Sequence, residues 1–265
     1  MALRQPILRE PERIRMARTS GFGVDIGGSG IKGCTVDLRS GSLEDERVRI
    51  LTPQPATPAA VAEVVATIAG EFGWHGPMGV TLPSVLKRGT VFTAAHLDPA
   101  WKGLDANGLF TEYCRVPVLV LNDADAAGLA EMRFGAGRDQ DGVVLLLTFG
   151  TGIGSALFVD GELVPNTELG HLTVDGADAE IRAAAAARED EALSWADWAT
   201  RVSRYLQVLE GLIWPDLIIA GGGVSKKADK WLPLLECRTP VVAAALRNDA
   251  GIVGAAAAAA EGRVP

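Results

Sequence analysis

Cysteine is scarce in this chain, and the three cysteines it contains lie far apart. Cys34, Cys114 and Cys237 form no Cys-x-x-Cys pair. A disulfide framework or a zinc site built from neighbouring cysteines needs more of them at closer spacing. The sequence therefore argues against a disulfide-stapled fold and a sequence-local zinc site, and we expect a reducing, cytoplasmic environment.

Long apolar runs and an excess of positive charge are also missing. No apolar stretch reaches the roughly 18 residues of a membrane span without a charge or a glycine. The 33 Asp and Glu residues outnumber the 25 Lys and Arg residues, which gives a net charge of −8. We therefore expect no membrane and no nucleic-acid partner. A small anion site stays open, because backbone amides bind phosphate whatever the net charge.

The composition that remains is that of a globular protein. The chain has 265 residues, of which 48% are hydrophobic and 22% charged. This length gives room for a sizeable core, in one large domain or in two packed lobes. Residues 1–20 carry several arginines but no apolar run long enough for a signal peptide. We predict that they form a flexible basic leader.

Strand-like and helix-like segments alternate along the rest of the chain. Apolar runs predict strands at 22–26, 31–38, 48–51, 78–82, 118–121, 143–149, 155–159 and 217–220. Apolar residues at helical spacing predict helices at 59–72, 124–134, 194–213 and 255–260. Such alternation is typical of the α/β class.

Two glycine-rich turns in this pattern resemble each other. Gly27-Gly28-Ser29-Gly30 and Gly150-Thr151-Gly152-Ile153-Gly154 each connect two predicted strands. Either the similarity is chance, or the chain has two lobes of similar design that face one cleft. The second interpretation is the more informative one, because it places both turns at the same site.

The first of these turns predicts a phosphate-binding hairpin. Gly28, Gly30 and Gly33 also fit the G-x-G-x-x-G dinucleotide fingerprint, but that fingerprint needs a helix to follow. β-Branched, alternating residues follow here and favour a strand. Small residues let backbone N–H groups approach phosphoryl oxygens, while Asp25 suits a hydrated Mg²⁺ and Lys32 supplies a positive charge. A plain tight turn would not account for these two charged residues.

A polar group follows the apolar run 118–121. Asn122, Asp123 and Asp125 stand at the carboxyl end of this predicted buried strand, where open α/β sheets bind ligands. A carboxylate there can take a proton from a substrate hydroxyl. Aspartate is also a common helix N-cap, and Asp125 fits that role better than Asp123 does. This division leaves Asp123 for chemistry.

Two further polar clusters have both a functional and a structural interpretation. Glu168 and His171, separated by Leu and Gly, suit recognition of a polyol, and a solvated loop is the alternative. The loop 221–223 is all glycine and precedes Lys226 and Lys227, which suits a phosphate chain or a nucleotide. For the two lysines, a solvated helix face is the alternative.

In this order, the segments resemble the ROK family of sugar kinases, which have the two-lobed, actin-like (hexokinase/ribonuclease H-like) ATPase fold. The resemblance spans about residues 22–254 and is closest to the polyphosphate glucokinases of that family. It implies a small lobe of residues 21–123 plus about 248–265 and a large lobe of 124–247. The motifs that carry it are Asp25-Ile-Gly-Gly-Ser-Gly-Ile-Lys-Gly, Thr52-Pro-Gln-Pro-Ala-Thr-Pro, Asn122-Asp-Ala-Asp-Ala-Ala-Gly, Gly150-Thr-Gly-Ile-Gly-Ser, Glu168-Leu-Gly-His and Gly221-Gly-Gly-Val-Ser-Lys-Lys.

The resemblance implies transfer of a terminal phosphoryl group to the 6-hydroxyl of glucose or mannose, with Asp123 as general base. It implies sugar contacts from Asn122, Glu168, His171 and Glu180, in a pocket bordered by Ser84 and His96. The phosphoryl donor would be inorganic polyphosphate or ATP, bound with Mg²⁺, which Asp25 is expected to hold through water. The donor-binding residues implied are Asp25, Gly27, Gly28, Ser29, Gly30, Lys32, Thr148, Gly150, Thr151, Gly152, Gly222, Gly223, Lys226 and Lys227.

Three features depart from the family pattern. Residues 175–180 contain no cysteine where many ROK proteins have a zinc loop, so we expect no zinc and assign His171 to the sugar. Ser84 and His96 replace the Gly and Asn that usually border the sugar pocket, which leaves sugar preference open. The leader is too short for the helix-turn-helix of the ROK repressors.

Two alternatives to a polyphosphate glucokinase remain open at this stage. One is an ATP-dependent glucokinase or mannokinase, and the other is a catalytically weak sugar-binding regulatory protein. A homodimer is expected from the family resemblance alone.

Overall fold

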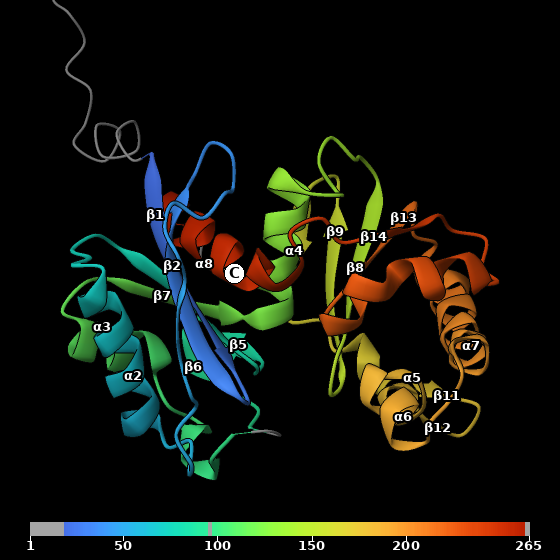
Figure 1. The fold of residues 1–265 in the computed structure, drawn as a ribbon, viewed down its shortest axis with the longest axis horizontal. Helices are drawn as coiled ribbons and strands as arrows, with labels where there is room; N and C mark the ends of the chain where they lie inside the picture. The colour runs from blue at the N-terminus through green and yellow to red at the C-terminus, as the bar shows by residue number, and fades with distance from the viewer. Residues whose placement is uncertain (1–18, 95–96, 263–265) are drawn as a thin grey trace, which may run out of the picture.

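Two five-stranded sheets form the frame of the molecule (Figure 1). The computed structural model describes residues 19–94 and 97–262. The first sheet has the order β3-β2-β1-β4-β7, formed by β1 (Ser20–Gly27), β2 (Gly30–Asp37), β3 (Val48–Ile50), β4 (Met78–Leu82) and β7 (Val118–Asn122). The second has the order β10-β9-β8-β13-β14, formed by β8 (Val143–Phe149), β9 (Ile153–Val159), β10 (Glu162–Val164), β13 (Leu217–Gly221) and β14 (Val241–Ala243).

The two sheets share one topology. In each, the first three strands form an antiparallel meander, and the last two add in parallel beside the first strand. The glycine turns at 27–30 and 150–154 therefore occupy equivalent positions, between the first and second strands of their sheets. This confirms the α/β class and the interpretation of the two turns as equivalent.

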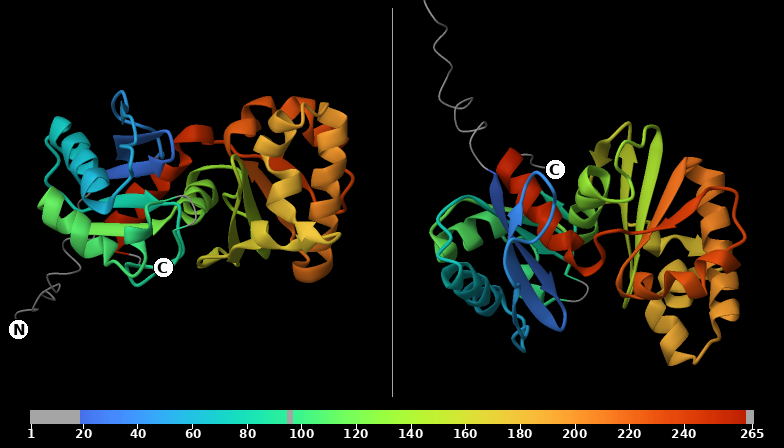
Figure 2. Two further views of the ribbon diagram at one scale, coloured as in Figure 1. Left: turned by 90° about the horizontal axis from the view of Figure 1, so that it is seen from below. Right: turned by 45° about the horizontal axis from the view of Figure 1, so that its top comes forward.

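Helices cover both sheets and fill the space between them. The main helices are α2 (Pro58–Glu71), α3 (Ala106–Cys114), α4 (Asp123–Phe134), α5 (Ala179–Ala183), α6 (Ala185–Asp190), α7 (Trp195–Ile213) and α8 (Ala250–Glu261). Figure 2 shows α4 and α8 between the two sheets, and their buried alanines join one core cluster with residues of β2, β8 and β9. The two helices therefore connect the halves of the molecule.

Glycine allows α8 to lie unusually close to the first sheet. A Cβ at Gly23 of β1 would overlap the carbonyl oxygen of Ile252, and one at Gly79 of β4 would overlap that of Ala255. Gly254 similarly makes room for the carbonyl oxygen of Ala126 in α4. Helix α8, at the C-terminal end of the described residues, is thus packed directly against the N-terminal sheet.

Most predicted elements appear within one or two residues of their expected bounds. The clearest difference is α8, which begins at Ala250, five residues earlier than the predicted start at 255. Gly251 and Gly254 weaken the helical signal there, but close packing of small residues stabilises the helix. Most of the predicted leader and His96 lie outside the described residues. Among the described residues, no helix is long and apolar enough to cross a membrane.

Candidate active site

A cavity of about 810 Å³ lies between the two sheets. Its walls come from both glycine turns, the β7–α4 junction, the segment 167–180 and the residues that precede α8. It brings together many of the residues singled out in the sequence: Asp25, Gly27, Gly28, Lys32, Ser84, Asn122, Asp123, Thr148, Gly150, Thr151, Gly152, Glu168, His171, Glu180 and Gly222.

Asp123 is the first residue of α4 and faces this cavity. The preceding residue, Asn122, is the N-cap: its Oδ1 accepts hydrogen bonds from the backbone N–H groups of Ala124 (2.8 Å) and Asp125 (3.0 Å). The expectation that Asp125 caps this helix is therefore wrong, because the helix begins one turn earlier than that role requires. The expectation for Asp123 does not change, because Asn122 caps the helix and the Asp123 carboxylate is not needed for that role.

Burial and negative neighbours raise the pKa of Asp123 to about 7. Removal from water is the larger cause, and the charges of Asp25 and Glu168 add to it. A carboxylate with a pKa near neutrality is well matched to general-base work, because it still accepts protons readily at the pH where it is largely ionised. The position and the electrostatics of Asp123 both suit proton abstraction from a bound hydroxyl.

Asp125 points away from this chemistry and takes part in a contact between the two halves. Its side chain is 1% exposed, and Oδ2 accepts a hydrogen bond of 2.8 Å from the backbone N–H of Asn166. The Asn166 side-chain amide in turn pairs with both backbone groups of Leu86, at 2.8 and 2.7 Å. These bonds fix the loop that leads into Glu168 against the first sheet's side of the cavity.

Three ionisable residues from one short stretch of chain form the opposite wall. Glu180 Oε2 accepts a hydrogen bond of 3.0 Å from the backbone N–H of Ile153. His171 Nδ1 lies 3.0 Å from Asp178 Oδ2, and this hydrogen bond raises the pKa of the imidazole. Burial raises the pKa of Glu168. Carboxylates and an imidazole in this arrangement offer acceptors and donors for the hydroxyls of a polyol.

The first glycine turn places charged side chains at the other end of the cavity. Asp25 of β1 is fixed by Thr81, whose hydroxyl donates to Oδ1 at 2.8 Å, and Lys32 Nζ lies 3.6 Å from Oδ2. Gly251 leaves room for this carboxylate, because a Cβ there would lie 2.9 Å from Asp25 Oδ1. The hydroxyl of Thr52 donates to the carbonyl oxygen of Gly27 at 2.5 Å and so supports the turn.

The glycines that follow the second sheet are only partly within the cavity. Gly221 and Gly222 line it, but Gly223, Lys226 and Lys227 do not, within the part of the chain that the structure describes. Both lysines are exposed and belong to the irregular 3₁₀ segment Gly223–Lys230. Ser29 and Gly30 of the first turn also lie outside the lining residues. These five residues, which were expected to bind the donor, are thus not among those that form the cavity walls.

Sequence reasoning missed several residues that shape the site. Thr81 holds Asp25, and Glu131 accepts three backbone hydrogen bonds, from Ala136, Ala245 and Leu246, at 2.7–3.0 Å. Arg247 lines the cavity with a φ of 52°, in the left-handed region. None of these residues belongs to a motif, since their partners lie far away in sequence. Only an acidic residue inside an apolar helical pattern could have pointed to Glu131.

The oxygen groups at the first turn fit a Mg²⁺ ion held mainly by its substrate. Mg²⁺ usually keeps several waters and binds one or two carboxylates together with phosphate oxygens. Asp25 and Asp123 both line the cavity and interact electrostatically. Among the described residues, no group of three or more His, Cys, Asp or Glu side chains could hold a metal ion by itself. The residues present therefore fit an ion that phosphate oxygens and waters would coordinate as well.

Comparison with known proteins identifies a family and several relatives. Residues 21–189 match the model of the ROK family. A polyphosphate glucokinase of Mycobacterium tuberculosis is 58% identical over 239 residues, which are 90% of each chain. The solved structure of an inorganic polyphosphate/ATP-glucomannokinase from Arthrobacter sp. strain KM is 51% identical, with a TM-score of 0.89 over 93% of this chain and 100% of that one.

A more distant structure supports the architecture. A ROK family glucokinase from Streptomyces griseus superimposes with a TM-score of 0.77 over 91% of this chain and 99% of that chain, at 24% identity. At that identity, the likeness shows the fold alone. The two structures confirm the two-lobed, actin-like architecture expected from the sequence, and the family model together with the mycobacterial relative shows that the chain belongs to the ROK family.

Proposed function

We propose that the protein is a polyphosphate-dependent glucokinase with Asp123 as its general base. The observation that carries the proposal is the place of Asp123, which lies in one cavity with both glycine turns and with Glu168, His171 and Glu180. The high identity to the mycobacterial enzyme supports this substrate pair.

The proposed reaction exchanges one phosphorus–oxygen bond for another. The oxygen of the glucose 6-hydroxyl attacks the terminal phosphorus of the donor, and its proton passes to the Asp123 carboxylate. The bond from that phosphorus to the bridging oxygen breaks, and the donor leaves one phosphoryl unit shorter. Positioning and charge neutralisation dominate this chemistry, so backbone N–H groups of the two turns and Lys32 would supply most of the protein's contribution.

A second group of cavity residues would recognise the sugar. Asn122, Glu168, His171 and Glu180 would bind hydroxyls, with Ser84 at the border of the pocket. Asp25, when Mg²⁺ is bound, would hold the ion through water, and the ion would neutralise charge on the donor phosphates. Use of mannose, a homodimeric state and a cytoplasmic location are further parts of the proposal that rest on the family resemblance.

ATP is the second donor that the observations favour. The Arthrobacter relative is named for both polyphosphate and ATP. The cavity is also lined by Gly221, Gly222 and Asn248 beyond the two turns, and we expect a nucleoside to bind beside these residues. A donor site made of backbone amides and one lysine does not by itself discriminate between the two polyanions.

Formation of glucose 6-phosphate, measured with polyphosphate or ATP and with or without Mg²⁺, tests the proposal directly. Asp123→Ala and the equally sized Asp123→Asn should each lose at least about 10²-fold in turnover, since base catalysis contributes about 10²–10⁴. Near-normal turnover in these variants would overturn the role of Asp123. If the wild type used neither donor on any common hexose, the protein would instead be a sugar-binding regulator.

A further inference from the structure

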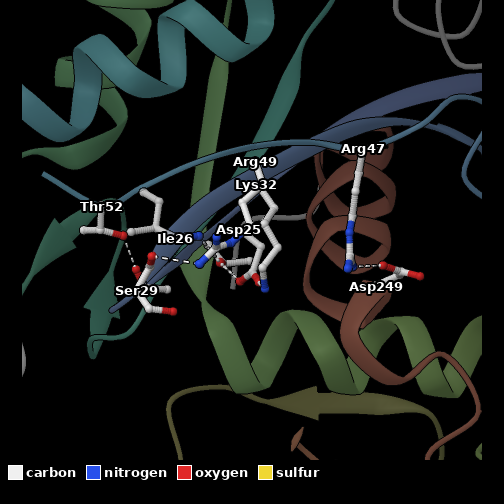
Figure 3. A network of polar contacts seen from close by, with 10 residues as sticks. Asp25, Ile26, Ser29, Lys32, Arg47, Arg49, Thr52 and Asp249 are labelled. Atoms are coloured by element: carbon white, nitrogen blue, oxygen red, sulfur yellow. Dashed lines mark hydrogen bonds and ion pairs between the residues drawn. The ribbon is translucent and has the colours of Figure 1, made fainter.

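A row of charged side chains crosses the first sheet from the cavity to its outer edge. Asp25 of β1 pairs directly with Lys32 of β2, and Lys32 pairs with Arg49 of β3. Directly paired residues point to the same face of a sheet, and Figure 3 shows the three side chains together, with Arg47 beyond them. The row therefore continues the positive charge of the donor turn outward, over strand β3.

Arg49 is held in place by the donor turn itself. Its Nη2 donates a hydrogen bond of 3.0 Å to the carbonyl oxygen of Ser29. Its guanidinium packs against Gly30, where an added Cβ would lie 2.7 Å from Nε and 2.9 Å from Cζ. Gly30 thus has a second use besides the turn: it makes the space in which the guanidinium lies flat beside the strand.

The charge of Arg49 is also the least compensated in this row. Lys32 lies 3.6 Å from Asp25, and Arg47 Nη1 lies 2.6 Å from Asp249 Oδ1. Among the described residues, no carboxylate lies within ion-pair distance of Arg49, whose hydrogen bond is to a neutral carbonyl. An exposed guanidinium in this state has donors left for an anion, and its planar shape suits phosphate oxygens.

We propose that Arg49 binds a phosphoryl unit of inorganic polyphosphate other than the one transferred, and so favours polyphosphate over ATP. This inference rests on the proposed function. The backbone of Arg49 lies two strands from Asp25, about 10 Å across the sheet, and its guanidinium reaches back to Ser29 and Gly30, which are not among the residues that line the cavity. A long chain whose end reacts beside Asp123 can continue out of the cavity over β3. The residues Lys226 and Lys227 are exposed at another border, with no described contact to orient them.

Arg49→Gln in the full chain tests this assignment. The ratio of the polyphosphate KM to the ATP KM should rise about fivefold, since hydrogen bonds to charged groups matter but solvent screens an exposed site. Arg49→Lys keeps the charge and should recover part of the loss. Arg39→Gln is the matched control, because Arg39 lies in the same half, is largely exposed and pairs with Asp37 outside the cavity.

Equilibrium binding of long-chain polyphosphate, measured without sugar, separates this inference from the kinase proposal. The Kd should weaken about fivefold in Arg49→Gln and stay within twofold in Arg39→Gln. Equal rises in both Michaelis constants, or an unchanged polyphosphate Kd in a variant that melts like the wild type, would overturn the assignment. If the wild type phosphorylates no sugar but the Kd still responds, the proposed function fails while the anion site stands.

Discussion

The two glycine turns of this molecule have the same place in the same sheet topology, yet their chemistry differs. The turn at 27–30 has residues of charged type around it: Asp25, Lys32 and Arg49 all lie on the strands it connects or beside them. The strands that the turn at 150–154 connects, β8 and β9, carry no charged residue. This turn is instead supported by Glu180, which accepts a hydrogen bond from the Ile153 N–H and which we propose as a sugar ligand.

This difference indicates how two turns of the same topology can serve two substrates. A turn with cations on the neighbouring strands can attract a polyanion. A turn that offers neutral backbone N–H groups, one of them bonded to a proposed sugar ligand, would connect the donor to the acceptor without adding positive charge. We expect changes in the first turn to affect donor use and proton transfer, and changes in the second to affect the sugar in addition to the donor.

The pH dependence of the reaction gives the largest expected effect. Asp123 must be ionised to accept a proton, and its pKa is raised to about 7 by burial and by the charges of Asp25 and Glu168. Below pH 7 the carboxylate takes up a proton, so kcat/KM should fall about tenfold for each pH unit. Initial rates with polyphosphate from pH 5 to pH 8 measure this decline.

The pH profile of kcat/KM, measured in one variant near each turn, distinguishes the two turns. Asp25→Asn removes one of the negative charges that raise the Asp123 pKa, so the decline should begin at a lower pH than in the wild type. Thr151→Ala, at a neutral and exposed position of the second turn, should leave the profile where it is. If the decline stayed at the same pH in Asp25→Asn, the charge of Asp25 would have no effect on the pKa of Asp123.

Alanine at one glycine of each turn should give an intermediate effect. A Cβ at Gly152 would overlap Glu180 Oε2, whereas one at Gly28 would have no atom within 4 Å. Gly152→Ala should therefore raise the glucose KM about tenfold and cost about 1–3 kcal/mol of stability. Gly28→Ala should leave stability within about 0.5 kcal/mol and raise the donor KM instead.

Steady-state kinetics in both substrates, with thermal melting, would measure this contrast. If both variants raised the same Michaelis constant, the two turns would not differ in the substrate that they affect. The comparison would be sharpened if Glu180→Gln, which keeps an acceptor for the Ile153 N–H, left the melting temperature near that of the wild type.

The sequence predicted those features that depend on neighbours in the chain. The strands, the turns and the group around Asp123 rest on local periodicity and glycine content, and they lie where they were expected. What could not be predicted depends on distant partners. Asn122 rather than Asp125 caps α4, Thr81 holds Asp25, and Asn166 reaches across to Leu86, because these bonds join segments that only the folded chain brings together.

The smallest expected effect concerns the lysines at the glycine loop after β13. Lys226→Glu combined with Lys227→Glu should raise the polyphosphate KM about two- to threefold, and more than the ATP KM, because exposed charges act weakly through solvent. The change reverses two charges, whereas Arg49→Gln removes one. A smaller response from the double variant would therefore indicate that the polyanion leaves the cavity over the first sheet. Equal effects on both donors would instead assign the lysines no part in the choice between them, and a response larger than that of Arg49→Gln would move the polyphosphate path to the second sheet.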